Sequence, residues 1–290
     1  MARGVRPTGR TRGTLLALPA TAFLVIVFAF PLVFLLILSF RPTNEYNETL
    51  DGFTLDQYVA IFTRDYMSSA LLNSLQIAAF TTVACAVLAY PVAWILARSN
   101  ASVLRTVTFL IVVSPLLTSV VVRSYGWRVI LSANGPLNST LMALGIIDEP
   151  VSMLLTQPVV LLTIIHVLLP FAIITLTTAL RTIDGTLYRA SESLGAGPVR
   201  TFVTVTLPLS LPGLLSGAML VFALALGIYV TPLLVGGANQ TLVGLRIYEQ
   251  VMTLFNQPIG AAFSYVLLAI SLVVIAAMTW ISRRLEVKRG

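Results

Sequence analysis

The chain has 290 residues, of which 57% are hydrophobic and only 10% are charged. This composition is more apolar than that of a soluble globular domain and indicates an integral membrane protein. The net charge is +7, but the basic residues are scattered at the ends of apolar runs and form no stripe, which excludes nucleic-acid binding.

Residues 1–13 carry four arginines among Gly, Thr and Pro and predict a flexible basic tail. The apolar stretch that follows is too long for a signal peptide and ends without a small-residue cleavage site, so it predicts an uncleaved span. With five later apolar runs it gives six membrane-spanning helices, at about residues 14–40, 70–97, 106–122, 158–180, 212–235 and 259–282. We therefore expect an all-α membrane protein with one domain over residues 14–290.

Basic residues predict the orientation of these spans. If the N-terminus lies inside, thirteen of the eighteen basic residues fall in inner segments and five in outer segments. Arg and Lys accumulate in cytoplasmic loops. We expect both termini and the segment 181–211 to be cytoplasmic.

The outer segments predict short helices at 56–62, 137–144 and 245–255, with turns at 134–136 and 236–237. Two interpretations stay open: these segments contact a soluble partner outside the membrane, or they merely close the bundle. Residues 199–207 alternate as in a strand, but Pro198 suits a first helical position and the chain offers no strand to pair with, so a helix is expected.

The cytoplasmic segment has helix signals of its own. Apolar or small residues recur at helical spacing from Leu187 to Leu194 and predict a short amphipathic helix. Asp184 or Thr186 can cap its start, and Gly195 provides a left-handed stop. A helix of about two turns is unstable alone. Its apolar side must therefore pack against something other than lipid.

Within this segment, residues 190–196 read ASESLGA and are followed by Phe202, Leu-Pro at 207–208 and Pro-Gly at 212–213. The arrangement resembles the EAA loop in the permease subunits of type I binding-protein-dependent ABC importers. In that family the helix usually begins Glu-Ala-Ala, whereas this chain has Arg, Ala and Ser at 189–191, so the first glutamate is missing. The resemblance extends from about residue 70 onward. Residues 229–237, YVTPLLVGG, and the stretch 245–251 look most like the spermidine and putrescine branch.

The resemblance implies a helix between spans four and five that docks on a separate ATPase chain. It assigns this coupling role to Leu187, Arg189, Ala190, Ser191, Glu192, Leu194, Gly195 and Ala196. It also implies a second, homologous permease in a heterodimer, two ATP-binding subunits, a periplasmic binding protein and a place in the bacterial inner membrane. ATP and Mg would be bound by the ATPase, and this chain is expected to have no cofactor, no metal and no catalytic residue.

The apolar runs contain no Asp, Glu, Lys or Arg, which a proton- or sodium-coupled carrier generally needs. The sole lysine, Lys288, excludes a phosphate-binding loop, and the sole cysteine, Cys85, excludes an intrachain disulfide and a Cys-based metal site. We interpret His166 as a hydrogen-bonded interior residue and not a proton carrier. The residues expected along the translocation path are Tyr125, Trp127, Tyr229 and Thr231.

Gly213, Gly217 and Gly227 allow close backbone approach and are expected at the interface with the second permease. Several alternatives stay open. The substrate is another small solute or ferric iron, or the chain is a self-contained channel or carrier of six spans. An intramembrane hydrolase is disfavoured because GxSxG, HExxH and paired membrane aspartates are missing from the sequence.

Overall fold

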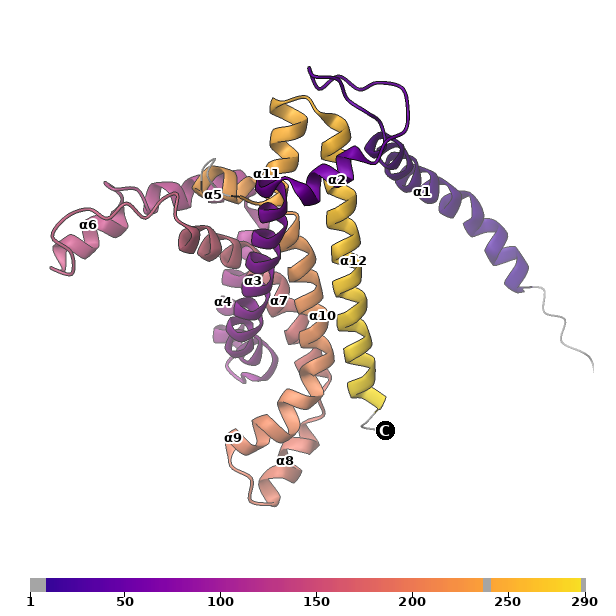
Figure 1. Ribbon diagram of the computed structural model, residues 1–290. Helices are drawn as coiled ribbons and strands as arrows, with labels where there is room; N and C mark the ends of the chain where they lie inside the picture. The colour runs from indigo at the N-terminus through magenta and orange to yellow at the C-terminus, as the bar shows by residue number, and fades with distance from the viewer. Residues whose placement is uncertain (1–8, 237–240, 288–290) are drawn as a thin grey trace, which may run out of the picture.

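The computed structural model describes residues 9–236 and 241–287, and nearly all of this part of the chain is helical (Figure 1). The helices in chain order are α1 (Gly9–Ser39), α2 (Asp56–Thr63), α3 (Asp65–Arg98), α4 (Ser102–Val113), α5 (Val120–Ile130), α6 (Pro136–Ala143), α7 (Gln157–Thr182), α8 (Gly185–Ser193), α9 (Pro198–Thr201), α10 (Leu207–Leu226), α11 (Val243–Tyr248) and α12 (Gln257–Val287). Extended backbone pairs only at an isolated bridge, Thr43 with Thr49, within the described ranges.

Five helical stretches are long and apolar enough to cross a membrane: Thr21–Ser39, Asp65–Arg98, Gln157–Thr182, Pro198–Leu226 and Gln257–Arg284. A sixth span would consist of Ser102–Leu117 and Val120–Ile130, which meet at 105°. The all-α membrane architecture expected from the sequence is confirmed.

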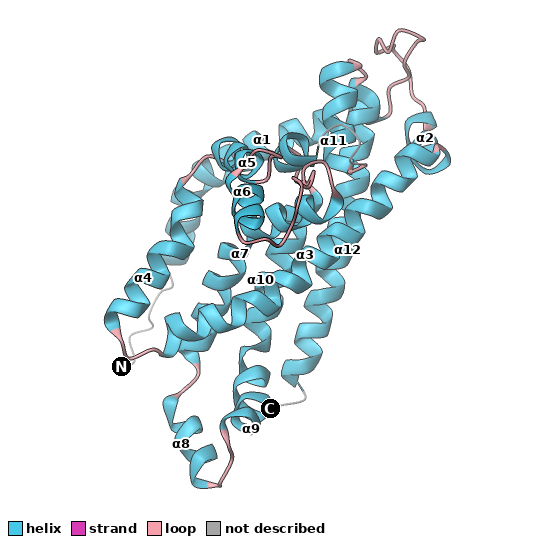
Figure 2. Ribbon diagram, turned by 90° about the vertical axis from the view of Figure 1, so that its left-hand side faces the viewer, coloured by secondary structure: helices cyan, strands magenta, loops and turns pink. Residues whose placement is uncertain are grey.

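The core lies between α3, α7 and α10, which stand side by side (Figure 2). Small residues let α7 and α10 approach closely: a Cβ built on Gly213 would overlap the Cβ of Ala179, and one on Gly217 would lie 3.4 Å from Thr175 Cβ. The expectation that these glycines face a second permease is therefore wrong, because they pack within the chain. A Cβ on Gly227 would meet no atom within 4 Å.

Helix α1 diverges from the bundle toward its N-terminus (Figure 1). It contacts α12 where the Tyr265 hydroxyl donates to the Leu32 carbonyl. Most of its described side chains are exposed, and none within Thr21–Leu38 is buried by the rest of this chain.

The third span is not the straight helix expected at 106–122. A 3-10 turn at Ser114–Leu117 ends α4, and the chain is extended at Thr118 and Ser119 before α5 begins. Pro115 has no amide proton, so the helical hydrogen-bond ladder is interrupted there. The Arg123 guanidinium then donates to the free Thr118 carbonyl at 3.1 Å, which stabilises the bend.

Other helix boundaries also differ from those predicted from the sequence. Helix α1 begins at Gly9, so residues 9–13 are helical and not tail; residues 1–8 lie outside the described residues. The fifth span ends at Leu226 and not at 235, because the helix stops at Gly227 and, after two non-helical residues, a separate turn begins that becomes π-helical at Pro232. The turn expected at 236–237 falls partly outside the described residues.

The expected outer helices are present as α2, α6, and α11 with the π-helical turn Glu249–Thr253. The alternating stretch after Pro198 is helical, as predicted. It forms α9 and a π-helical turn, Phe202–Thr206, that runs directly into α10.

Candidate functional site

The segment between α7 and α10 folds into α8 and α9 and projects beyond the ends of the spans (Figure 1). Asp184 is the N-cap of α8, and its carboxylate accepts the Thr186 amide at 2.8 Å. Hydrogen bonding from Thr186, chiefly from its backbone amide, lowers the pKa of Asp184. At the other end Gly195 has φ +77, and the Ala196 amide donates to the Ser191 carbonyl at 3.1 Å. Both ends of the predicted helix are thus set by the residues proposed for them.

One edge of α8 is left without cover from its own chain. Leu187, Ala190 and Leu194 lie along it and are exposed, with 86% of Leu194 accessible. Arg189 and Glu192 are also exposed. The exposed apolar edge is defined here as Leu187, Ala190 and Leu194.

Ser191 departs from the expected pattern. Its side chain is buried and its hydroxyl lies 2.9 Å from that of Thr201 on α9, so it points into the segment and not toward the exposed edge. Ser191 fixes α8 to α9. A partner bound on the exposed edge would not contact it.

Sequence reasoning missed Tyr188, which joins α8 to the end of α3. Its ring makes an edge contact with Trp94, centroids 5.9 Å apart, and the Arg98 guanidinium lies 4.6 Å from its centroid. The only sequence signal is an aromatic residue next to Leu187 in a short polar helix. Tyr188 orients α8 relative to the membrane bundle.

Two arginines link the neighbouring C-terminal ends of α3 and α7 by hydrogen bonds in both directions. Arg98 of α3 donates to the carbonyls of Leu180 and Ile183 at 2.9 and 2.7 Å. Arg181 of α7 donates to the Leu96 carbonyl of α3 at 3.1 Å. Each helix thereby satisfies carbonyls at the C-terminal end of the other. With Tyr188 on Arg98, the ends of α3, α7 and α8 form one connected unit.

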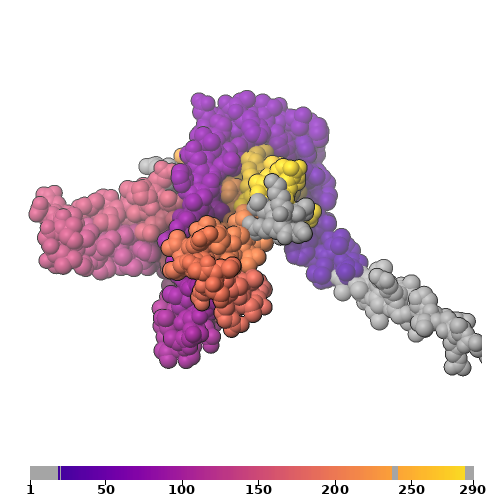
Figure 3. All heavy atoms as spheres, turned by 90° about the horizontal axis from the view of Figure 1, so that it is seen from below, coloured from indigo at the N-terminus to yellow at the C-terminus, as the bar shows by residue number. Residues whose placement is uncertain are grey.

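A cavity of about 760 Å³ lies between α3 and the projecting segment, beside these contacts. Aromatic side chains line it, with Tyr90 packed on Phe202 and Trp94 on Tyr188, and Glu192 and Ala196 lie at its border. Seen from below, α8 and α9 stand in front of the bundle (Figure 3).

The residues expected along a translocation path lie toward the opposite end of the bundle, on different elements. Tyr229 stacks on Tyr248 at 5.6 Å and lines a cavity of about 320 Å³. Thr231 is buried, and its hydroxyl accepts from Ser124 at 3.3 Å. Tyr125 is exposed on α5.

Trp127, the fourth of these residues, contacts the interior histidine. Its indole N–H donates to His166 Nδ1 at 3.2 Å. A nitrogen that accepts a hydrogen bond carries no proton, so this contact requires that His166 bear its proton on Nε2. His166 is the hydrogen-bonded interior residue that the sequence indicated.

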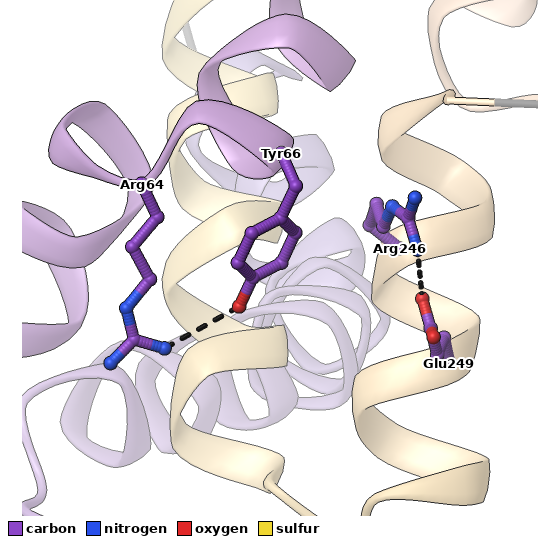
Figure 4. A network of polar contacts seen from close by, with 4 residues as sticks. All are labelled: Arg64, Tyr66, Arg246 and Glu249. Atoms are coloured by element: carbon purple, nitrogen blue, oxygen red, sulfur yellow. Dashed lines mark hydrogen bonds and ion pairs between the residues drawn. The ribbon is translucent and has the colours of Figure 1, made fainter.

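A polar network lies at the end of the bundle opposite α8 and α9 (Figure 4). Arg246 and Glu249, one turn apart on α11 and its continuation, form an ion pair, and the Arg246 guanidinium lies 5.9 Å from the Tyr66 ring centroid. Arg64 donates to the Tyr66 hydroxyl at 3.4 Å. The network ties the start of α3 to α11. No cluster of three or more metal-ligating side chains occurs among the residues described.

Comparison with known proteins identifies the family. The family model for the binding-protein-dependent transport system inner membrane component matches residues 89–287. The chain belongs to this family. It is a multi-pass inner-membrane protein with the fold of ABC importer permeases, as the sequence resemblance implied.

Two curated relatives and one solved structure illustrate the likeness. The spermidine/putrescine transport system permease protein PotB of Escherichia coli (strain K12) is 34% identical over 267 residues, 92% of this chain and 96% of the relative. The molybdenum transport system permease protein ModB of Mycobacterium bovis (strain ATCC BAA-935 / AF2122/97) is 34% identical over 77% of this chain and 80% of its own length. A chain of the bacterial alginate ABC transporter, crystallised with its alginate pentasaccharide-bound periplasmic protein, has a TM-score of 0.76 and 18% identity, with 93% of each chain covered.

Proposed function

We propose that this chain is the permease subunit of an ATP-driven importer whose substrate is a polyamine, spermidine or putrescine. The observation that carries the proposal is the 34% identity to a spermidine/putrescine permease along 92% of this chain and 96% of that one. The match therefore includes the outer segments as well as the shared membrane core. The second candidate substrate is an anion such as molybdate. It is supported by the 34% identity to the molybdenum permease, which covers a smaller share of this chain.

The exposed apolar edge of α8 is the proposed contact with the ATPase, which in this proposal is a separate chain that binds ATP and Mg. Two features support this role. The edge is exposed beyond the ends of the spans, and Tyr188 with Arg98 connects α8 to α3. A displacement of α8 would therefore be transmitted to α3 and α7.

A second, homologous permease would complete the translocation path as a heterodimer. Helix α1 is available to pack against it, because its side chains between Thr21 and Leu38 are not buried by this chain. A periplasmic binding protein would deliver the substrate at the outer end. In this proposal both termini and α8 lie in the cytoplasm, which the distribution of basic residues supports.

A measurement of solute uptake identifies the substrate. The chain is expressed with its neighbouring genes in cells that lack polyamine uptake, and entry of labelled spermidine, putrescine and molybdate is measured. Saturable polyamine entry that an excess of molybdate leaves unchanged supports the proposal. Molybdate entry without polyamine entry would assign the anion instead.

Docking of the ATPase is tested with Leu194→Asp, which places a charge on the exposed apolar edge. Desolvating an unpaired carboxylate at an interface is unfavourable, so co-purification of the ATPase and substrate-stimulated hydrolysis should both fall. The matched control is Leu144→Asp, since Leu144 is 67% exposed on the outer side of the bundle. Equal ATPase recovery in both variants would exclude the α8 edge as the contact.

Orientation is tested by labelling a cysteine at position 195 in a Cys85→Ser background. We expect no reaction with an impermeant reagent in intact cells and reaction after the inner membrane is opened. Labelling from the outside would overturn the topology.

A further inference from the structure

A cavity of about 380 Å³ lies between the ends of α3, α4 and α7 that are nearest to α8. Leu96, Phe109 and Ile174 form its apolar wall, and Arg105, Thr106 and Arg181 contribute its polar groups. Cavities of this size are within the range that small ligands occupy. Helix α4 stands at the edge of the bundle (Figure 2), so the cavity opens toward the surroundings of the bundle and not toward its core.

The two guanidinium groups have donors to spare. Arg181 is exposed, and its guanidinium donates one hydrogen bond, to the Leu96 carbonyl. The Arg105 side chain is exposed and makes no hydrogen bond within the described chain. The ion pairs found in residues 9–236 and 241–287, Arg41 with Asp51 and Arg246 with Glu249, include neither of them. Two cations that line one cavity without an acidic neighbour attract an anion.

The remaining groups indicate what kind of anion fits. The hydroxyls of Thr177 and Thr178 already donate to the carbonyls of Ile173 and Ile174, so Thr106 is the hydroxyl left to donate. Guanidinium and hydroxyl donors match the oxygens of a phosphate. Beside them, Phe109 and Ile174 are exposed apolar side chains within the proposed membrane span. A soluble anion would leave this apolar wall unused.

We propose that the cavity binds the phosphate headgroup of an anionic phospholipid, with its acyl chains along Phe109 and Ile174. Basic pockets between helices near the cytoplasmic surface have this use in membrane proteins. The lipid belongs to the inner leaflet under the orientation proposed above. Arg105 and Arg181 hold the phosphate, and the lipid joins α4 to α7.

Native mass spectrometry of the full-length chain in detergent tests this site, with phosphatidylglycerol, phosphatidylcholine and inorganic phosphate as separate probes. We expect phosphatidylglycerol to bind more tightly than phosphatidylcholine, and inorganic phosphate not to displace it. Each arginine contributes on the order of fivefold in affinity, so Arg105→Gln should weaken phosphatidylglycerol about fivefold and Arg105→Gln with Arg181→Gln roughly 30-fold.

Arg105→Gln alone keeps the test decisive if loss of the Arg181 bond to α3 unfolds the double variant. The matched control is Arg200→Gln, an exposed arginine near the same end that does not line the cavity. An equal loss of affinity in Arg200→Gln would show that the lipid responds only to total charge and would overturn the site. Unchanged affinity in Arg105→Gln would also overturn it, and displacement by inorganic phosphate would assign the cavity to a soluble anion.

Discussion

Replacing Gly195 by alanine isolates the backbone conformation that ends α8. Gly195 has φ +77, and a Cβ built there meets no atom within 4 Å. The substitution therefore introduces no clash, and its cost is that of a left-handed residue with a Cβ, roughly 1–2 kcal/mol. This corresponds to about a 5- to 30-fold shift in any equilibrium that opens this turn.

Gly185→Ala is the matched control. Gly185 is also open to an added Cβ, but it is the first residue of α8 and has a negative φ, so alanine is favoured over glycine there, by at most the roughly 0.5–1 kcal/mol of a helix interior. The same chemical change should thus act with the opposite sign at the two ends of one helix. Both variants should reach the membrane, because neither position lies in a span.

Hydrogen exchange of the reconstituted chain measures the effect. The amides of residues 194–196 donate to carbonyls of α8, so their exchange reports on opening of this turn. We expect exchange about 5- to 30-fold faster in Gly195→Ala and slower in Gly185→Ala. If Gly195→Ala exchanges like the unaltered chain, the left-handed turn does not hold the end of α8 and the reasoning is wrong.

Three further predictions concern single contacts. Tyr188→Phe should keep substrate-stimulated ATPase activity near its normal level, whereas Tyr188→Ala removes two ring contacts worth about 1–3 kcal/mol together and should lower it strongly. His166→Gln should retain most uptake, since a glutamine oxygen can accept from Trp127; loss of uptake in an assembled complex would give His166 a larger role. The Thr186 amide lowers the pKa of Asp184, so the stabilisation of α8 by the ionised cap is complete above the ordinary aspartate pKa and is lost as pH falls through the lowered pKa. Amide protection in α8 should therefore be constant near neutral pH and decline only in acid.

The spans and the capped helix could be predicted because they depend on local signals. Continuous apolar runs locate most ends of α3, α7 and α12 to within two residues. The exceptions are that α3 starts five residues before its predicted start and α12 ends five residues after its predicted end. Asp184 and Gly195 end α8 through contacts only a few residues away in sequence. For these elements the sequence contains the whole physical cause.

The missed features depend on tertiary contacts. The bend after Leu117 interrupts an apolar run that looks continuous, and it is stabilised by Arg123, which lies beyond the bend. Tyr188 meets Trp94 and Arg98 only because α3 and α7 end beside each other, a register that one sequence does not reveal. The inward orientation of Ser191 also depends on a tertiary contact, because its hydroxyl forms a hydrogen bond with that of Thr201 on α9.

The bend has a consequence for the lipid around the protein. The stretch Ser102–Leu117 before the bend is at most about 26 Å long, whereas the hydrocarbon core of a bilayer is about 30 Å thick. Because α5 leaves at 105°, it adds little to this height. Beside α4 this mismatch of a few ångströms favours local thinning of the bilayer or snorkelling of flanking side chains, at a fraction of a kcal/mol for each ångström. The acyl-chain length of the surrounding lipid therefore influences the tilt of α4 relative to α7, as contact with a protein partner also would.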